Sequence, residues 1–208
     1  MQDSLTSQRR RSLLLAAGAT LAAPLAAYAQ AGGEDIVIGG SIPMTGVFAF
    51  AGVGINAGIS DYVKIVSDGG GVKGRKLRYV PEDTGYKVDV SVATFKKITS
   101  QNKVNFYYGD STGFSKTINP ELERNGAIMM AGASFATELN DPVKYPNQFL
   151  VGPDYTEMFG ILLNHIAKEK PGAKVAFVYS DSEFGRDPID SSEALAKKLG
   201  LNVVIKIM

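Results

Sequence analysis

Short apolar runs recur along the chain, and each has the length of a β-strand. They lie at 36–39, 77–80, 104–108, 127–130, 148–151, 175–179 and 203–207. Between most of these runs, apolar residues repeat every three or four positions, which is the spacing of one face of a helix. The clearest of these faces lie at 55–66, 88–98, 159–166 and 189–199. Strands that alternate with helices predict an α/β fold, with a doubly wound parallel sheet and right-handed crossovers.

Three prolines, Pro142, Pro146 and Pro153, surround the run at 148–151. After them the strand–helix pattern restarts at Lys174. We therefore expect a first α/β lobe over residues 30–150, followed by a hinge crossing and the start of a second α/β lobe over residues 151–208. One strand, one helix and one strand are too little to close a core, so we expect the second lobe to be incomplete.

The N-terminal segment has the order of an export signal. A basic cluster, Arg9–Arg11, leads into apolar residues 13–27, and Ala27-Tyr28-Ala29 follows as a small-x-small cleavage site. Gly18 and Pro24 interrupt the apolar run, which is shorter than the ~20 residues that span a bilayer. We expect residues 1–29 to be a cleaved signal peptide. The arginine cluster fits both the general secretory and the twin-arginine route, and the sequence leaves that choice open.

Composition excludes several classes of function. The formal net charge of +1 gives no electrostatic attraction to nucleic acid, so we expect no nucleic-acid partner. The chain has no cysteine, which rules out disulfides, thiolate metal sites and a cysteine nucleophile. His165 is the single histidine, which rules out a multi-histidine metal site. We expect neither a metal nor a cofactor.

The segment Gly52–Gly58 is close to a dinucleotide-binding fingerprint, with Glu82-Asp83 at the end of the next predicted strand. That fingerprint requires its glycines to turn directly out of the first strand, so that the pyrophosphate meets the N-terminus of the helix. Here a longer segment that includes Pro43 intervenes after Gly40. A glycine-rich loop leading into a helix is the favoured interpretation.

Residues Gly109-Asp110-Ser111-Thr112-Gly113 form a G-x-S-x-G pattern between a strand and a helix, which is the context of a nucleophile elbow. A serine hydrolase also needs a histidine to take the proton, and His165 falls within a predicted helix, away from its apolar face. The alternative is that Ser111 and Thr112 offer hydroxyl and backbone N–H donors to an anion at the start of a helix.

A third loop, Gly132–Ala136, carries Ser134 directly after a predicted strand. Loops at the carboxyl ends of adjacent parallel strands meet at one crevice. We therefore expect the loops Pro43–Gly52, Gly109–Gly113 and Gly132–Ala136 to line the same opening.

Several further segments carry a family resemblance. They are Gly39–Gly46, Gly70–Leu77, Glu82–Tyr86, Phe184-Gly185-Arg186 and the single residue Tyr155. In these segments, and over essentially all of Ile36–Met208, the chain resembles periplasmic solute-binding proteins of ABC transporters, of the Leu/Ile/Val-binding type. The resemblance implies a type I periplasmic-binding-protein fold, whose two lobes close on a small ligand by hinge motion. It also implies a periplasmic location and delivery of the ligand to ABC permease membrane subunits.

The resemblance further implies a set of ligand-binding residues and no catalysis. Phe48 and Phe50 would be apolar walls, Ser111 and Thr112 would hold a ligand carboxylate, and Ser134 would be a second donor. Tyr155 would line the site near the hinge, and Phe184 would be an aromatic lid. The resemblance implies that the ligand is an amino acid, an organic acid or an amide. The family usually has threonine where Phe135 stands, and the loss of that donor argues against a zwitterionic amino acid and for an organic acid or an amide.

Two other functions stay open. A ligand-sensing receptor or regulator would use the same clamp, and a secreted serine hydrolase would use Ser111 with His165. Members of the resembled family extend well beyond the position that corresponds to Met208. We therefore expect this chain to be a fragment, a truncated product, or a protein whose partner segment is encoded separately.

Overall fold

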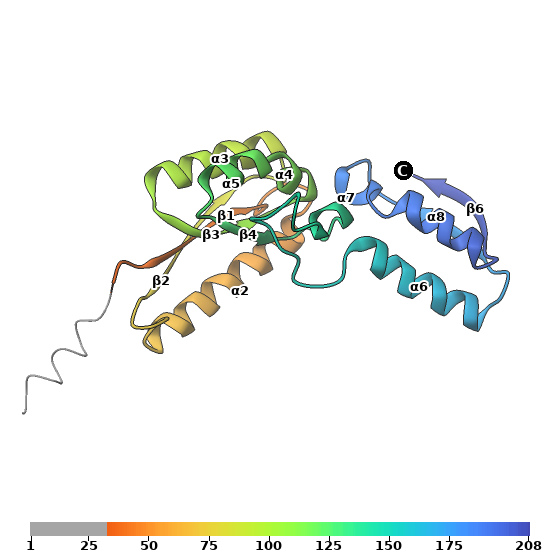
Figure 1. Ribbon diagram of the computed structural model, residues 1–208, viewed down its shortest axis with the longest axis horizontal. Helices are drawn as coiled ribbons and strands as arrows, with labels where there is room; N and C mark the ends of the chain where they lie inside the picture. The colour runs from red at the N-terminus through yellow and green to blue at the C-terminus, as the bar shows by residue number, and fades with distance from the viewer. Residues whose placement is uncertain (1–32) are drawn as a thin grey trace, which may run out of the picture. The chain divides into compact units, whose positions relative to one another are not determined.

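Figure 1 shows a computed structural model of the chain, in which residues 33–208 are described. The predicted signal peptide, residues 1–29, lies outside the described residues. The described chain divides into two compact units, a smaller one of residues 33–36 and 64–77 and a larger one of residues 37–63 and 78–208. Within residues 33–208, no helix combines the length and the apolar character needed to cross a bilayer.

A four-stranded sheet forms the first part of the fold. Its strands are β1 (Ile36–Ile42), β2 (Leu77–Asp83), β3 (Val104–Gly109) and β4 (Met129–Gly132), in the order β2-β1-β3-β4. β3 pairs in parallel with both β1 and β4. A helix-bearing crossover joins each consecutive pair of strands, so the α/β class predicted from the pattern is confirmed.

Four helices accompany this sheet: α2 (Ala49–Asp68), α3 (Val88–Gln101), α4 (Thr112–Thr117) and α5 (Asn119–Asn125). In Figure 1, α3, α4 and α5 lie on one side of the sheet and α2 lies on the other. The apolar face predicted for α3 is confirmed, because Phe95 and Ile98 are buried in a cluster with Tyr107 and Phe114. The face predicted at 55–66 lies on α2, but it is not buried along its whole length, because Tyr62 is 66% exposed.

Gly52 is the one buried residue of α2, because the start of this helix packs tightly on the preceding loop. A Cβ atom at Gly52 would lie 2.1 Å from the carbonyl oxygen of Pro43, closer than any side chain allows. Gly54 and Gly58 also lie inside α2, where added Cβ atoms would meet open space. All three glycines lie inside the helix, which contradicts the dinucleotide interpretation of this segment and also the favoured interpretation as a loop that leads into a helix.

The smaller unit contains the glycine-rich turn of the motif Gly70–Leu77. Val72 and Arg75 exchange backbone hydrogen bonds across the tip, where Lys73 and Gly74 have φ values of 53° and 79°. Gly71 has a φ of 72°, and a Cβ atom there would lie 2.0 Å from the carbonyl oxygen of Arg75. Only glycine fits this position, which gives the motif a physical reason.

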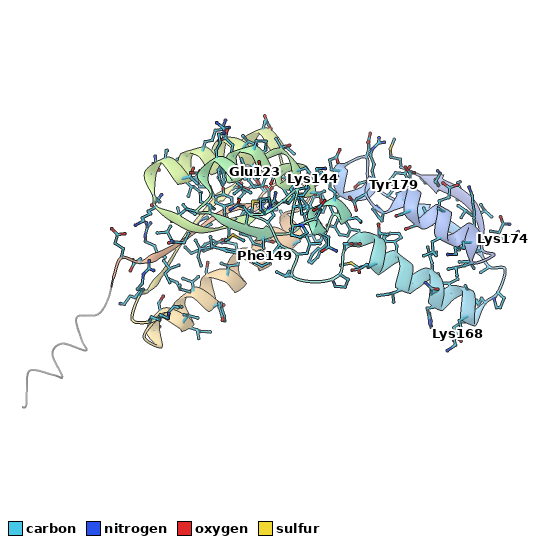
Figure 2. The ribbon with its side chains drawn as sticks, viewed as in Figure 1. Glu123, Lys144, Phe149, Lys168, Lys174 and Tyr179 are labelled. Carbon is cyan, nitrogen blue, oxygen red and sulfur yellow. The ribbon has the colours of Figure 1, made fainter. Side chains whose placement is uncertain are left out.

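A two-stranded sheet forms the second part of the larger unit. It pairs β5 (Lys174–Val178) with β6 (Asn202–Ile207) in parallel. The accompanying helices are α6 (Tyr155–Glu169), α7 (Glu183–Arg186) and α8 (Ile189–Lys198). α6 and α8 supply Leu163, Ile189 and Ala196 to a second hydrophobic cluster around Phe177. At the turn between α6 and β5, the side chains of Lys168 and Lys174 project into solvent (Figure 2).

The segment between β4 and α6 differs from the sequence-based expectation. Residues 148–151 were expected to form a strand, but Gln148 makes only an isolated parallel bridge to Met130. Prolines at 142, 146 and 153 lack the N–H groups that a longer ladder requires. A short 3₁₀ helix, η1 (Thr137–Asn140), occupies part of this segment. The expected lobe boundary at residues 150–151 falls in the segment between β4 and α6, and it stays a prediction.

Candidate functional site

Two neighbouring cavities in the larger unit share aromatic walls. The larger has a volume of about 260 Å³ and is lined by residues that include Phe48, Tyr155, Phe159, Phe184 and Pro188. The smaller, of about 180 Å³, is lined by Phe48, Phe50, Ala51, Tyr86, Asp110, Ala133 and Phe184. Because Phe48 and Phe184 line both cavities, we treat the two as one candidate site.

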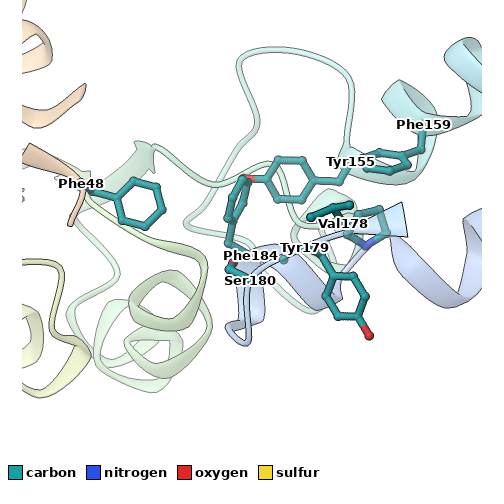
Figure 3. A pocket seen from close by; sticks show the side chains of 9 residues that line it. Phe48, Tyr155, Phe159, Val178, Tyr179, Ser180 and Phe184 are labelled. Atoms are coloured by element: carbon teal, nitrogen blue, oxygen red, sulfur yellow. The ribbon is translucent and has the colours of Figure 1, made fainter. Parts of the chain in front are cut away.

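The aromatic side chains of this site contact one another directly. The ring of Phe184 meets the ring of Tyr155 edge-on at 5.3 Å between centroids, and that of Phe48 at 6.3 Å. Figure 3 shows Phe48 pointing toward these two rings, while the ring of Tyr179 points away from them. Edge-to-face pairs of this kind add to the stabilisation from buried area. The arrangement makes an apolar-walled site.

Local capping positions Tyr155 at the start of α6. The Asp154 side chain accepts a hydrogen bond from the Glu157 backbone N–H at 2.9 Å, and the Glu157 carboxylate accepts one from the Asp154 N–H at 3.1 Å. This reciprocal capping box fixes the first turn of the helix. Tyr155 is the first residue after the cap and is 8% exposed, so its ring is held by both the cap and packing.

Phe184 is positioned by the short helix α7. Ser182 caps this helix by accepting a hydrogen bond from the Gly185 N–H at 3.2 Å. A Cβ atom at Gly185 would lie 2.2 Å from the carbonyl oxygen of Ser180, so this tight turn requires glycine. The Lys116 ammonium of α4 lies 2.9 Å from Glu183 and 3.2 Å from Glu138. The pair with Glu183 ties the helix that carries Phe184 to α4, and the pair with Glu138 ties η1 to the same lysine.

Tyr86 is a site residue that the sequence reasoning missed. Its ring centroid lies 4.0 Å from that of Phe48, and its φ of 63° is uncommon for a bulky residue. Asp83 shapes this turn by accepting hydrogen bonds from the Thr45 hydroxyl at 2.6 Å and the Gly85 N–H at 3.1 Å. Burial raises the pKa of Tyr86 to about 12, with smaller contributions from Tyr155 and Asp110. The sequence did contain a signal for this residue, because Gly85 and Tyr86 place a glycine and an aromatic residue just after the strand β2.

Asp110 was also missed, and it is the charged residue that lines the smaller cavity. It is 1% exposed, and its carboxylate accepts hydrogen bonds from three hydroxyl groups. The Ser91 hydroxyl donates to Oδ2 at 2.8 Å, the Ser111 hydroxyl donates to Oδ1 at 3.0 Å, and the Thr84 hydroxyl also donates to Oδ2. Its position directly before Ser111 in the G-x-S-x-G pattern was the available signal.

The hydroxyl groups predicted to hold a ligand are buried and bonded within the protein. Ser111 caps α4 by accepting a hydrogen bond from the Phe114 N–H at 3.2 Å, in addition to its bond to Asp110. The hydroxyls of Thr112 and Ser134 bond to each other at 2.8 Å. The structure thus brings Ser111, Thr112 and Ser134 together at the ends of β3 and β4, but none of them is among the residues lining these two cavities. Their role in binding stays a prediction.

Four other predicted residues line the site. Phe48 and Phe184 line both cavities, Tyr155 lines the larger, and Phe50 lines the smaller at 82% exposure. Their contact with a ligand is likewise a prediction. For the hydrolase alternative, the Ser111 hydroxyl bonds to Asp110 and to the Phe114 N–H, while His165 lies exposed on α6. The geometry favours an apolar binding site with one buried carboxylate.

Comparison with known proteins identifies close counterparts of this architecture. A model of the periplasmic binding protein family matches residues 35–207. A Leu/Ile/Val-binding protein homologue of Brucella melitensis is 25% identical over 178 residues, which cover 85% of this chain and 48% of that protein. The chain thus spans about half the length of the curated relatives it matches.

Solved structures agree with this match. A branched-chain amino acid ABC transporter protein from Thermus thermophilus, with bound valine, superposes with a TM-score of 0.78 at 29% identity. The match covers 84% of this chain and 45% of that one. A fatty acid ABC transporter substrate-binding protein from Thermomonospora curvata, at 21% identity, shares the fold with a TM-score of 0.75, and the match covers 84% of this chain and 44% of that one. The α/β architecture and the family match together show that the chain belongs to the periplasmic binding protein family.

Proposed function

We propose that this chain is the solute-binding component of an ABC importer and binds a small, partly apolar solute at the Phe48–Phe184 site. The observation that carries the proposal is the aromatic site itself, where Phe48, Tyr155 and Phe184 surround a cavity of about 260 Å³. Small-molecule sites are typically concave and apolar, with few polar groups. The proposed solute is an amino acid, an organic acid or an amide.

The aromatic rings would bind the apolar part of the solute and exclude water from it. Phe184 is 38% exposed and Phe50 is 82% exposed without solute, so both have apolar area left to bury. Burying such area is favourable by roughly 25 cal/mol per Å². The Ser111 hydroxyl donates its proton to Asp110, so it would donate to a solute only after giving up that bond. In the Thr112–Ser134 pair one hydroxyl donates and the other accepts, so the accepting hydroxyl keeps a proton that it would donate to a solute.

The proposed setting follows the family. The solute-bearing protein would act in the periplasm after export by the N-terminal signal, and would deliver its solute to ABC permease membrane subunits. It would act without catalysis, because its relatives are binding proteins for transporters. The valine bound by the Thermus relative makes branched-chain amino acids the first solutes to test.

Binding can be measured on the full chain by saturation-transfer NMR and calorimetry with valine and leucine. We expect both to bind, and Phe184→Ala to weaken binding by about tenfold, because the substitution removes an aromatic wall shared by both cavities. Tyr62→Ala is the matched control, since this aromatic residue is 66% exposed on α2 and lies outside both cavities. Equal binding by the two variants would contradict the site.

A further inference from the structure

The smaller cavity combines one buried carboxylate with several aromatic rings. A carboxylate has about four positions at which it accepts hydrogen bonds. Thr84 and Ser91 donate to Oδ2 of Asp110, and Ser111 donates to Oδ1. Oδ1 therefore keeps capacity for one more donor.

Within residues 33–208, no described ion pair joins a cation to this carboxylate. Each of the three donors is a neutral hydroxyl, and the ion pairs described for residues 33–208 do not include Asp110. The Lys116 ammonium is already surrounded by Glu138, Glu183 and Asp187. A buried charge is costly unless it is paired and hydrogen-bonded, so a cationic partner for Asp110 would be favourable.

A second Asp-Ser turn in the same chain has an aspartate that is paired with a cation. Asp181 precedes Ser182 as Asp110 precedes Ser111, and Asp181 bonds to the Arg186 guanidinium, with Nε 2.8 Å from Oδ1. Among the described residues, a cation therefore pairs with the carboxylate of the exposed turn, and no described ion pair includes that of the buried one.

The walls of the smaller cavity suit a cation as well. The ring of Phe48 lies 4.0 Å from that of Tyr86 and 5.8 Å from that of Phe50, and Phe184 borders the same cavity. The faces of aromatic rings attract ammonium groups within about 6 Å, more strongly where water is excluded.

We propose that Asp110, together with the rings of Phe48, Tyr86 and Phe184, binds the ammonium group of the solute. This inference rests on the proposed function and narrows its solute class to amines and amino acids with an apolar side chain. Organic acids without an ammonium group fall outside that class.

The test compares four probes that share one branched hydrocarbon skeleton, by saturation-transfer NMR on the unaltered full chain. Leucine carries an ammonium and a carboxylate, isoamylamine only the ammonium, isocaproate only the carboxylate, and isoamyl alcohol neither. We expect leucine and isoamylamine to bind, and isocaproate to bind about tenfold more weakly or less. Isocaproate binding as tightly as isoamylamine would overturn the ammonium assignment and leave the binding function standing. Failure of all four probes would overturn the proposed function and the assignment with it.

The variant Asp110→Asn removes the charge and nearly preserves the shape. We expect isoamylamine to bind this variant about tenfold more weakly, and isoamyl alcohol to bind it as it binds the unaltered chain. Asp181→Asn is the matched control, and it should change neither the binding of isoamylamine nor the binding of isoamyl alcohol. If Asp110→Asn does not fold, the probe series on the unaltered chain decides the question by itself. Undiminished isoamylamine binding by folded Asp110→Asn would overturn the assignment.

Discussion

The two Asp-Ser turns of the chain have the same local structure in different surroundings. Ser111 caps α4 after β3, and Ser182 caps α7 after β5, each accepting a backbone N–H at 3.2 Å. The aspartate before Ser111 is 1% exposed among hydroxyls, whereas the Asp181 side chain is 62% exposed and pairs with Arg186. Local sequence therefore decides the cap, and the surrounding fold decides the state of the neighbouring carboxylate.

The sheets that carry these turns differ in the same way. Around β3 the core buries Phe95, Tyr107 and Phe114 almost completely. The β5–β6 sheet is covered on the face of Phe177, but its other face leaves Val178 76% and Ile205 50% exposed. Parallel sheets are ordinarily buried on both faces. We infer that the described part of the second sheet is the less stable region.

The largest effect expected from this difference concerns the two buried phenylalanines. Phe114→Ala should lower the free energy of unfolding by about 3–5 kcal/mol, because it leaves a cavity among fully enclosed rings. Phe177→Ala should cost less, because its cluster is covered on one side and can adjust. Urea denaturation followed by far-ultraviolet circular dichroism measures both. A larger loss for Phe177→Ala would reverse our ranking of the two regions.

A smaller effect is expected for the two caps. Ser111→Ala should cost about 1–2 kcal/mol, because it removes an N-cap and also one donor to buried Asp110. Ser182→Ala removes the same kind of cap at a more exposed turn, and should cost about 0.5–1 kcal/mol. The same denaturation experiment compares them. Equal losses would mean that the hydroxyl bond to Asp110 adds nothing.

The smallest effect concerns acid stability. Burial acts to raise the pKa of Asp83, but hydrogen bonds from the Thr45 hydroxyl and from backbone N–H groups outweigh it and hold this pKa below its usual value. The resulting stabilisation is complete above the unfolded pKa of about 4 and is lost as pH falls through the lower folded value. Asp83→Asn should remove it, at a cost below about 1 kcal/mol because the group is largely exposed.

An acid titration followed by tyrosine circular dichroism measures this effect, since the chain has no tryptophan. The variant should lose less stability than the unaltered chain between about pH 4 and pH 2. Glu193→Gln is the control in the second region, where hydrogen bonds from Lys206 and Lys197 lower the pKa of a partly exposed carboxylate. A stronger change for the control than for Asp83→Asn would contradict the prediction.

Much of the fold was predictable from the sequence, for identifiable reasons. Phe95 and Ile98 repeat at helical spacing on α3, and both are buried. The prediction of a strand at 148–151 was wrong, because an apolar run does not show whether its backbone pairs with a neighbouring strand, and here only Gln148 makes a bridge. Tyr62 lies on the face predicted at 55–66 and yet is exposed, because periodicity shows which residues share a face but not whether anything covers that face.

The candidate site was predictable only in part. Phe48, Tyr155 and Phe184 were found by resemblance, and the structure places all three around one cavity. Tyr86 and Asp110 were missed because their place in the lining of the smaller cavity depends on residues that are distant in sequence. The Thr84 and Ser91 hydroxyls reach Asp110 from other segments of the chain, and no local pattern contains them.

The amino-acid sequence by itself determined the order of strands and helices, the caps and the glycine turns, because these depend on residues within a few positions of one another. Gly71 and Ser111 are examples, since each acts on atoms no more than four residues away. Only the tertiary structure decided which hydroxyls bond to other groups of the protein, that the Asp110 carboxylate is buried among hydroxyls, and which aromatic rings line a cavity. Those properties depend on burial and on long-range contacts, which set the cost of a buried charge and the value of an apolar wall.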